Sequence, residues 1–151
     1  MKAKKNWLDT ELRAQQAKTL DQHYRVHETD AARQQAAQQE SQALQGLHAL
    51  ASSWRRGRES ATLTPGVERL YQRFHEQLQG EATGAAKAHV ERQQALDDAQ
   101  IALRHSHAMQ QALDRTVARR DQRVAKGAQA RERDLANEAW MLDRAGRKGS
   151  E

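Results

Sequence analysis

Apolar residues between positions 85 and 145 recur at steps that alternate between three and four residues. The positions that follow this rhythm are Leu96, Ala99, Leu103, Ser106, Gln110, Leu113, Val117, Arg120, Val124, Ala128, Arg131, Leu135, Glu138 and Leu142. This is the spacing of a helix that buries one narrow seam against another helix. The stretch has no proline and one interior glycine, so the sequence predicts a long helix over 85–145. Polar residues at several seam positions predict weak, adjustable pairing.

Upstream, apolar residues at helical spacing predict a first helix over 4–56. Glycine, serine and threonine residues then interrupt the pattern, so 57–66 is predicted to be a connector. A short amphipathic helix is predicted at the tip, over 67–79, and a disordered tail over 146–151.

Two local signals set the boundaries of the tip helix. Thr64 and Pro65 are residue types that favour the N-cap and the first position of a helix, and Glu68 suits its first turn. Gly80 and Gly84 predict a second break before the long helix. A helix that runs unbroken through both glycines is the alternative.

These elements predict an all-α fold, a long antiparallel two-helix coiled-coil hairpin with a short helix at the bend, as a single elongated domain over 1–151. In the register that this implies, the apolar and aromatic pairs are Leu12 with Leu135, Leu44 with Leu103, Leu50 with Leu96, and Trp7 with Trp140. If the helix instead ran unbroken from Pro65, Trp7 would lie near residue 115. The last residues, about thirty of them, would then extend past the partner helix.

Composition supports this picture and narrows the function. Hydrophobic residues make up 37% of the 151 residues and aromatic residues 4%, too little for a compact core. Abundant alanine, glutamine, arginine and leucine favour helix over disorder. The absence of cysteine excludes disulfides and thiolate chemistry. No apolar run resembles a membrane span or a signal peptide, so we expect a cytoplasmic protein without stable membrane insertion. The net charge of +5 indicates an acidic partner.

Nothing in the sequence predicts catalysis or a cofactor. It has no glycine-rich phosphate loop, no serine-centred nucleophile motif and no carboxylate pair in a plausible pocket. His23 and His27 are four residues apart and could share a metal ion, but we interpret them as exposed polar residues. The expected protein is not an enzyme.

Two basic clusters bear on the partner. One consists of Arg55, Arg56 and Arg58, and the other of Arg115, Arg119, Arg120, Arg123, Lys126, Arg131 and Arg133. The spacing of the second cluster is interpreted as spreading charge around the helix. A solvated face is the first interpretation and docking on an acidic protein the second. Nucleic acid is ranked last, because interleaved aromatics and a basic leucine zipper are both missing.

Aromatic residues are expected at the two ends of the hairpin. Trp54, Tyr71 and Phe74 belong to the bend, whereas Trp7 and Trp140 belong to the open end. They either seal the seam locally or serve as anchors for partners, because buried tryptophan and tyrosine supply much of the binding energy between proteins.

The ending Leu135-Ala136-Asn137-Glu138-Ala139-Trp140-Met141-Leu142-Asp143-Arg144, followed by Gly146, Arg147 and Lys148, resembles the C-terminal helix and short basic tail of the FliJ/YscO stalk proteins. Those proteins belong to bacterial type III secretion and flagellar export. Length, basic charge and the absence of cysteine fit the same family. The bias towards alanine, arginine and glutamine is most similar to the versions in plant-pathogen injectisomes, which serve virulence.

The resemblance implies a central stalk that couples a hexameric secretion ATPase to the cytoplasmic domain of a membrane-embedded export gate, at the periphery of the inner membrane. It implies an ATPase-facing surface of Trp7, Arg131, Arg133, Trp140, Arg144, Arg147 and Lys148. It also implies a gate-facing surface of Trp54, Tyr71, Phe74 and Leu78. Family members also escort secretion chaperones.

Two other hypotheses stay open at this point. One is a basic coiled-coil adaptor or nucleic-acid-binding protein, which the net charge favours. The other is a structural coiled coil that self-associates, because an intrachain seam and an interchain seam satisfy the same apolar pattern.

Overall fold

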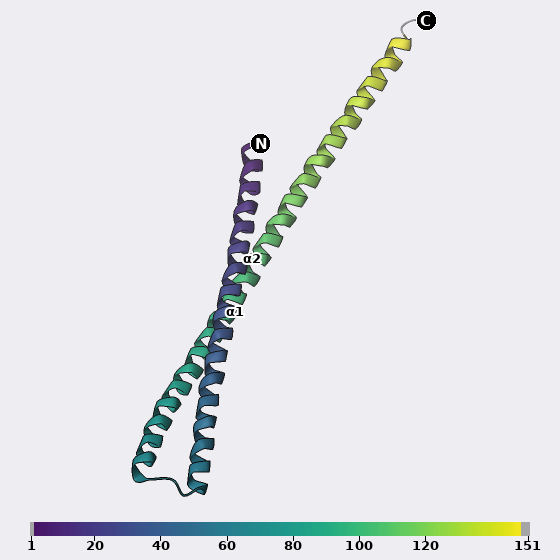
Figure 1. Cartoon of the computed structure of the whole chain (residues 1–151). Helices are drawn as coiled ribbons and strands as arrows, with labels where there is room; N and C mark the ends of the chain where they lie inside the picture. The colour runs from purple at the N-terminus through teal and green to yellow at the C-terminus, as the bar shows by residue number, and fades with distance from the viewer. Residues whose placement is uncertain (1, 149–151) are drawn as a thin grey trace. The chain divides into compact units, whose positions relative to one another are not determined.

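A computed structural model describes residues 2–148 of the chain, with side chains over 7–144. Two α-helices, α1 (Lys2–Glu59) and α2 (Pro65–Lys148), account for all of these residues except the link at 60–64. Figure 1 shows each helix as a continuous ribbon. The predicted all-α fold with two long paired helices is confirmed.

Backbone groups at both helix ends next to the link make hydrogen bonds that end α1 and start α2. At the end of α1, the Ser60 backbone N–H donates to the Arg56 carbonyl over 3.1 Å, and Ala61 has a φ of 52° that turns the chain out of the helix. At the start of α2, the Val67 backbone N–H donates to the Thr64 hydroxyl over 3.4 Å. The predicted N-cap at Thr64, with Pro65 in the first helical position, is confirmed.

The separate tip helix over 67–79 and the break at Gly80 and Gly84 are wrong. Both glycines lie inside α2, which continues from Pro65 through the predicted 85–145 helix and into the predicted disordered tail as far as Lys148. An interior glycine costs a helix only about 1 kcal/mol, and good helix formers on both sides, without proline, offset that cost. The unbroken helix, our alternative, is the correct description.

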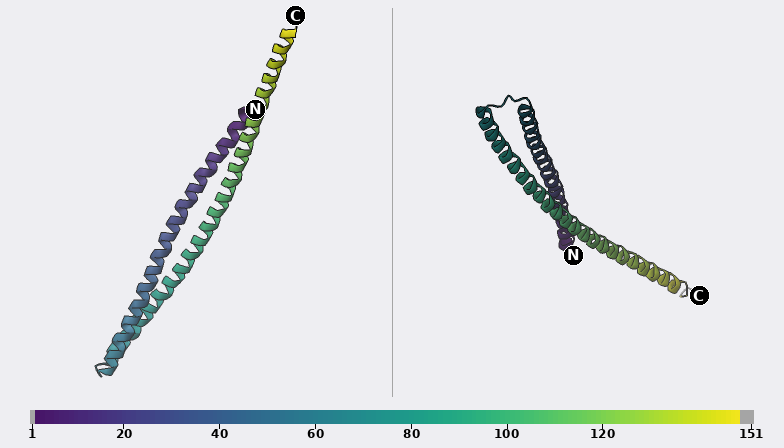
Figure 2. Two further views of the ribbon diagram at one scale, coloured as in Figure 1. Left: turned by 90° about the vertical axis from the view of Figure 1, so that its right-hand side faces the viewer. Right: turned by 90° about the horizontal axis from the view of Figure 1, so that it is seen from below.

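The chain consists of two compact units, residues 18–106 and residues 1–17 with 107–151. Within the 18–106 unit, the facing pairs are Thr19 with Ser106, Glu40 with His89, and Trp54 with Tyr71. The two helix segments in this unit are therefore antiparallel, and both views of Figure 2 show the link closing one end of the unit.

The register expected from a broken helix is wrong in both units. In the 1–17 and 107–151 unit, Asp9 pairs with Arg120, so Leu12 cannot be level with Leu135. In the 18–106 unit, His89 rather than Leu103 lies opposite the Glu40 region. The physical reason is the continuity of α2: without a second bend, its pairing with α1 begins directly after the link.

The core is one thin seam. Ala36, Ala82 and Leu96 are the buried apolar side chains among the described residues, and Thr19 and Ser106 are buried beside them. The predicted seam of α2 is confirmed from Leu96 to Arg120, because each of its positions over that range is buried or half-buried. From position 121 to 144 every described residue is exposed.

Candidate partner-binding surfaces

The residues at the link divide into a packed part and an exposed part. Trp54 of α1 stacks on Tyr71 of α2, with ring centroids 4.1 Å apart and planes at 20°. Tyr71 in turn stacks on His75, with centroids 5.8 Å apart. Leu78 is half-buried and faces Gly46, where an added Cβ would lie 3.6 Å from its Cδ2. Trp54, Tyr71 and Leu78 therefore pack locally.

The exposed part of the link region is apolar. Phe74 is 54% exposed, and Val67 and Leu70 beside it are exposed to a similar degree. A pocket of about 300 Å³ lies among these side chains and is lined by Leu50, Ser53, Trp54, Gly57, Thr62, Leu63, Val67, Leu70, Tyr71 and Phe74. We call Trp54, Val67, Leu70, Tyr71 and Phe74 the link surface.

Sequence reasoning included Phe74 in this surface but missed Val67 and Leu70. Both occupy apolar positions of the predicted 67–79 helix, for which burial is the usual expectation. Val67 is level with the end of α1 at Glu59 and has few residues opposite it, whereas Leu70 points about 100° away from Tyr71, which faces α1.

The last described turns of α2 carry a second group of exposed large side chains. Trp140 is 59% exposed, Leu135 65%, and Met141 and Leu142 are more exposed still. The Arg144 guanidinium carbon lies 5.1 Å from the centre of the Trp140 ring, in a cation–π contact one helical turn away. We call the exposed end of α2 that carries Leu135, Trp140, Met141, Leu142 and Arg144 the C-terminal surface; Trp140 and Arg144 lie on one side of this helix end, and Leu135 and Leu142 on the other.

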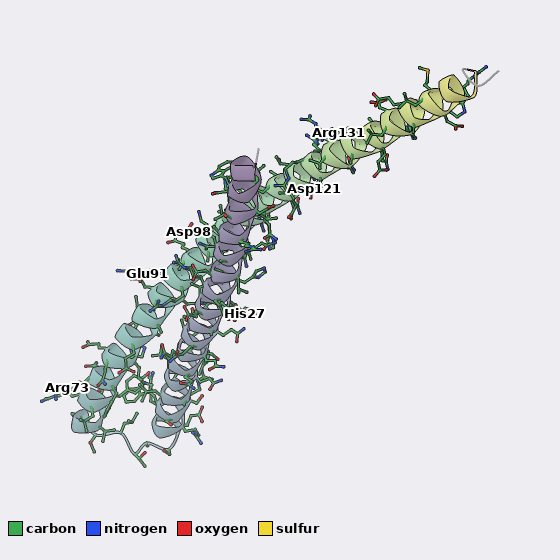
Figure 3. The ribbon with its side chains drawn as sticks, turned by 90° about the horizontal axis from the view of Figure 1, so that it is seen from above. His27, Arg73, Glu91, Asp98, Asp121 and Arg131 are labelled. Atoms are coloured by element: carbon green, nitrogen blue, oxygen red, sulfur yellow. The ribbon has the colours of Figure 1, made fainter. Side chains whose placement is uncertain are left out.

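The other predicted ATPase-facing residues are not all part of this surface. Arg131 and Arg133 are exposed on α2, and Figure 3 shows the Arg131 side chain standing out from the helix. Trp7 is 63% exposed on α1, two residues before Asp9, which pairs with Arg120. Trp140 is twenty residues farther along α2, roughly 30 Å at 1.5 Å per residue. Trp7 and Trp140 therefore do not form one patch. The side chains of Arg147 and Lys148 lie outside the described residues.

Arg120 is a basic seam residue whose charge is matched by carboxylates of its own unit. Its Nη2 donates to Asp9 Oδ1 over 3.0 Å, and its Nε donates to Asp121 Oδ1 over 3.0 Å. The hydrogen bond to Asp9, followed by the one to Asp121, raises the pKa of Arg120 above its ordinary value. Arg120 therefore stays charged at any physiological pH and ties α1 to α2 in this unit.

Five exposed basic residues of α2 lie along one face of the helix. At about 100° per residue, their directions fall within about 40° of one another, whereas the half-buried seam residues Leu113 and Val117 point to the opposite side. We call these five the basic stripe: Arg115, Arg119, Lys126, Arg133 and Arg144. Four members of the basic cluster at 115–133 share this face. The other three, Arg120, Arg123 and Arg131, point about 80° to 160° away from Arg115 and spread the remaining charge around the helix.

The histidines of the described residues lie apart from any metal-binding cluster. No group of three or more histidine, aspartate and glutamate side chains within them could hold a metal ion. His23 and His27 are both exposed. His89 Nδ1 lies 2.6 Å from Glu40 Oε2, so this histidine is a link between helices. Neither helix has a stretch within residues 2–148 that is long and apolar enough to cross a bilayer.

Comparison of the chain with protein families, with curated proteins and with solved structures finds no match. The functional argument therefore depends on the surfaces described above.

Proposed function

We propose that the protein is a non-enzymatic stalk of a type III secretion export apparatus, which couples the hexameric ATPase to the export gate. The observation that carries the proposal is the C-terminal surface, where Trp140 and its stacked Arg144 are exposed on one side of a helix end whose other side exposes Leu135 and Leu142. Tryptophan and arginine are the residue types most enriched at the energetic centres of protein interfaces. A helix that keeps them in solvent is suited to insertion into a partner.

In this proposal the two surfaces have different partners. The C-terminal surface, with Arg131 and Arg133 nearby, contacts the ATPase. The link surface contacts the cytoplasmic domain of the gate protein, chiefly through Phe74, Val67 and Leu70. Contiguous exposed apolar side chains of this kind are uncommon on a soluble protein that has no partner. The protein acts in the cytoplasm at the inner-membrane apparatus, where it also meets secretion chaperones.

ATP turnover by the hexameric ATPase tests the proposal. Adding the unmodified chain is expected to raise the rate of ATP hydrolysis. The variant Trp140→Ala with Arg144→Ala should need at least about tenfold more protein for the same stimulation, because each side chain is of the type that contributes more than 1 kcal/mol at an interface centre.

The matched control is Ile101→Ala with Arg104→Ala. These residues are also exposed on α2, but they belong to neither surface. The control should stimulate as the unmodified chain does. The proposal would be contradicted if the unmodified chain changed neither the rate of ATP hydrolysis nor the elution volume of the ATPase in size-exclusion chromatography.

A further inference from the structure

We propose that the basic stripe is a docking surface for an acidic α-helix of a partner protein, one that carries carboxylates at about seven-residue intervals. The inference rests on the geometry of α2 and does not depend on the proposed function. Arg144 is shared with the C-terminal surface, and the other four stripe residues lie outside that surface.

The stripe is an uninterrupted line of positive charge. Its members follow one another at steps of 4, 7, 7 and 11 residues, each close to a whole number of turns. Over residues 107–144 the acidic side chain nearest in direction is Asp134, which lies about 60° outside the stripe. No ion pair among the described side chains includes a stripe residue. The charge of the stripe is therefore available to a partner.

Most of the stripe lies on the face of α2 opposite the seam, whereas Arg119 reaches toward α1 and lines a pocket with Leu8 and Arg120. Leu113 and Val117 turn toward the α1 segment of their unit, so the stripe stays accessible while the two helices are paired. Docking there needs no opening of the helix pair.

A straight line of charge fits a second helix better than other polyanions. From Arg115 to Arg144 the stripe runs about 45 Å, nearly parallel to the axis of α2. Carboxylates seven residues apart on a partner helix form a line of the same spacing. The phosphates of a nucleic-acid duplex wind around its axis, so a straight stripe can meet them only where the two cross. Aromatic side chains at intervals, which single strands need for stacking, are absent between Arg115 and Arg133.

The residue types also favour carboxylates on a protein. Four of the five stripe residues are arginine, whose planar guanidinium binds a carboxylate through two parallel hydrogen bonds. Trp140 borders the stripe next to Arg144 and offers an anchor of the kind that protein interfaces use. The neutral residues between the charges, such as Gln122, Ala130 and Asn137, form no apolar face for insertion into a membrane surface.

The test uses two synthetic helical peptides of identical composition and the full chain. The matched peptide has glutamates separated by 4, 7 and 7 residues, and the scrambled peptide has the same glutamates out of line. Fluorescence anisotropy at low salt should show the matched peptide binding at least about tenfold more tightly. Raising the salt concentration should weaken this binding, because the charges are exposed.

Two triple variants locate the site. Arg119→Gln, Lys126→Gln and Arg133→Gln together should abolish the preference for the matched peptide. The control, Arg73→Gln, Arg92→Gln and Arg131→Gln, removes the same charge from exposed positions of α2 outside the stripe and should keep the preference. Figure 3 labels Arg73 and Arg131 of this control set. Circular dichroism of both variants checks that the helices are intact.

Three results would overturn the proposal. The first is no binding of the matched peptide by the unmodified chain. The second is an equal loss of binding in the two triple variants, which would indicate a response to net charge alone. The third is stripe-dependent binding to a 20-base-pair DNA duplex, or to vesicles containing anionic phosphatidylglycerol, that is tighter than binding to the matched peptide.

Discussion

At the scale of single residues, several of the contacts that join α1 to α2 are polar. Glu40 and His89 meet over 2.6 Å in the 18–106 unit, and their side chains are only about 30% exposed. In the same unit the Thr19 and Ser106 hydroxyls are 3.1 Å apart in a buried hydrogen bond. A polar pair inside a narrow seam favours one register, because any slip would separate the partners. These polar pairs therefore fix the register of the two helices, which the small apolar area of the seam alone would define poorly.

A double-mutant cycle on Thr19 and Ser106 tests this idea. Thr19→Val and Ser106→Ala should each lower the free energy of unfolding by about 1 kcal/mol, the usual net value of one hydrogen bond. The double variant should lose little more than either single variant, because both changes remove the same bond. Thermal melts followed by circular dichroism measure all four proteins. Strictly additive losses would show that the two hydroxyls are not coupled.

At the scale of elements, the continuity of α2 through Gly80 and Gly84 determines which residues of α2 lie opposite α1. The helix holds Gly80 and Gly84 in its interior, and an added Cβ at either position would meet no atom within 4 Å. Neither glycine is therefore needed to let another part of the chain pack closely against α2. Their cost to the helix is the loss of chain entropy that any interior glycine carries.

Substitution of these glycines should move stability in opposite directions. Gly80→Ala and Gly84→Ala should each stabilise the chain by about 0.5–1 kcal/mol, because alanine costs less entropy and has room. Gly84→Pro should destabilise it by about 3 kcal/mol, because proline lacks the N–H and clashes with the preceding turn. Urea unfolding measures the changes. Proline tolerated at 84 together with no gain from alanine would indicate that α2 is broken there.

Much of this element could be predicted from the sequence, and the missing part has a definite cause. The seam from Leu96 to Arg120 follows from the spacing of apolar residues, which is a local property. Whether two glycines break a helix depends on the balance of about 1 kcal/mol each against all the turns around them. A sequence pattern does not resolve a difference of that size. The wrong choice at Gly80 then shifted the expected register of the whole seam.

For the partner-binding surfaces, too, features set by local spacing could be predicted, whereas features that depend on the register could not. Trp140 and Arg144 could be predicted as exposed neighbours, because they are one turn apart near the end of a helix. Their expected grouping with Trp7 failed, because it depended on the register. The spacing of the basic stripe is visible in the sequence, but Arg120, Arg123 and Arg131 lie among its members and point to other sides of the helix, which obscures the line.

At the scale of the whole molecule, α2 is longer than α1, so part of α2 has no segment of α1 beside it. In the 18–106 unit, the two helices run antiparallel from the link, and the first turns of α2 expose Val67, Leu70 and Phe74. In the other unit, Asp9 pairs with Arg120, and α2 continues to Lys148 with every described side chain beyond Arg120 exposed. The register of the two helices therefore decides which surfaces are available for partners.

Distances between spin labels within one molecule test this register most directly. The chain has no cysteine, so labels can be placed at Arg13→Cys with either Arg115→Cys or Arg133→Cys, all exposed positions of one unit. Labelled protein diluted with unlabelled protein reports intramolecular distances alone. An unbroken α2 predicts that labels at 13 and 115 lie within about 20 Å, on neighbouring helices, and that labels at 13 and 133 lie about 30 Å apart. The reverse order, with 133 nearer to 13 than 115 is, would contradict it.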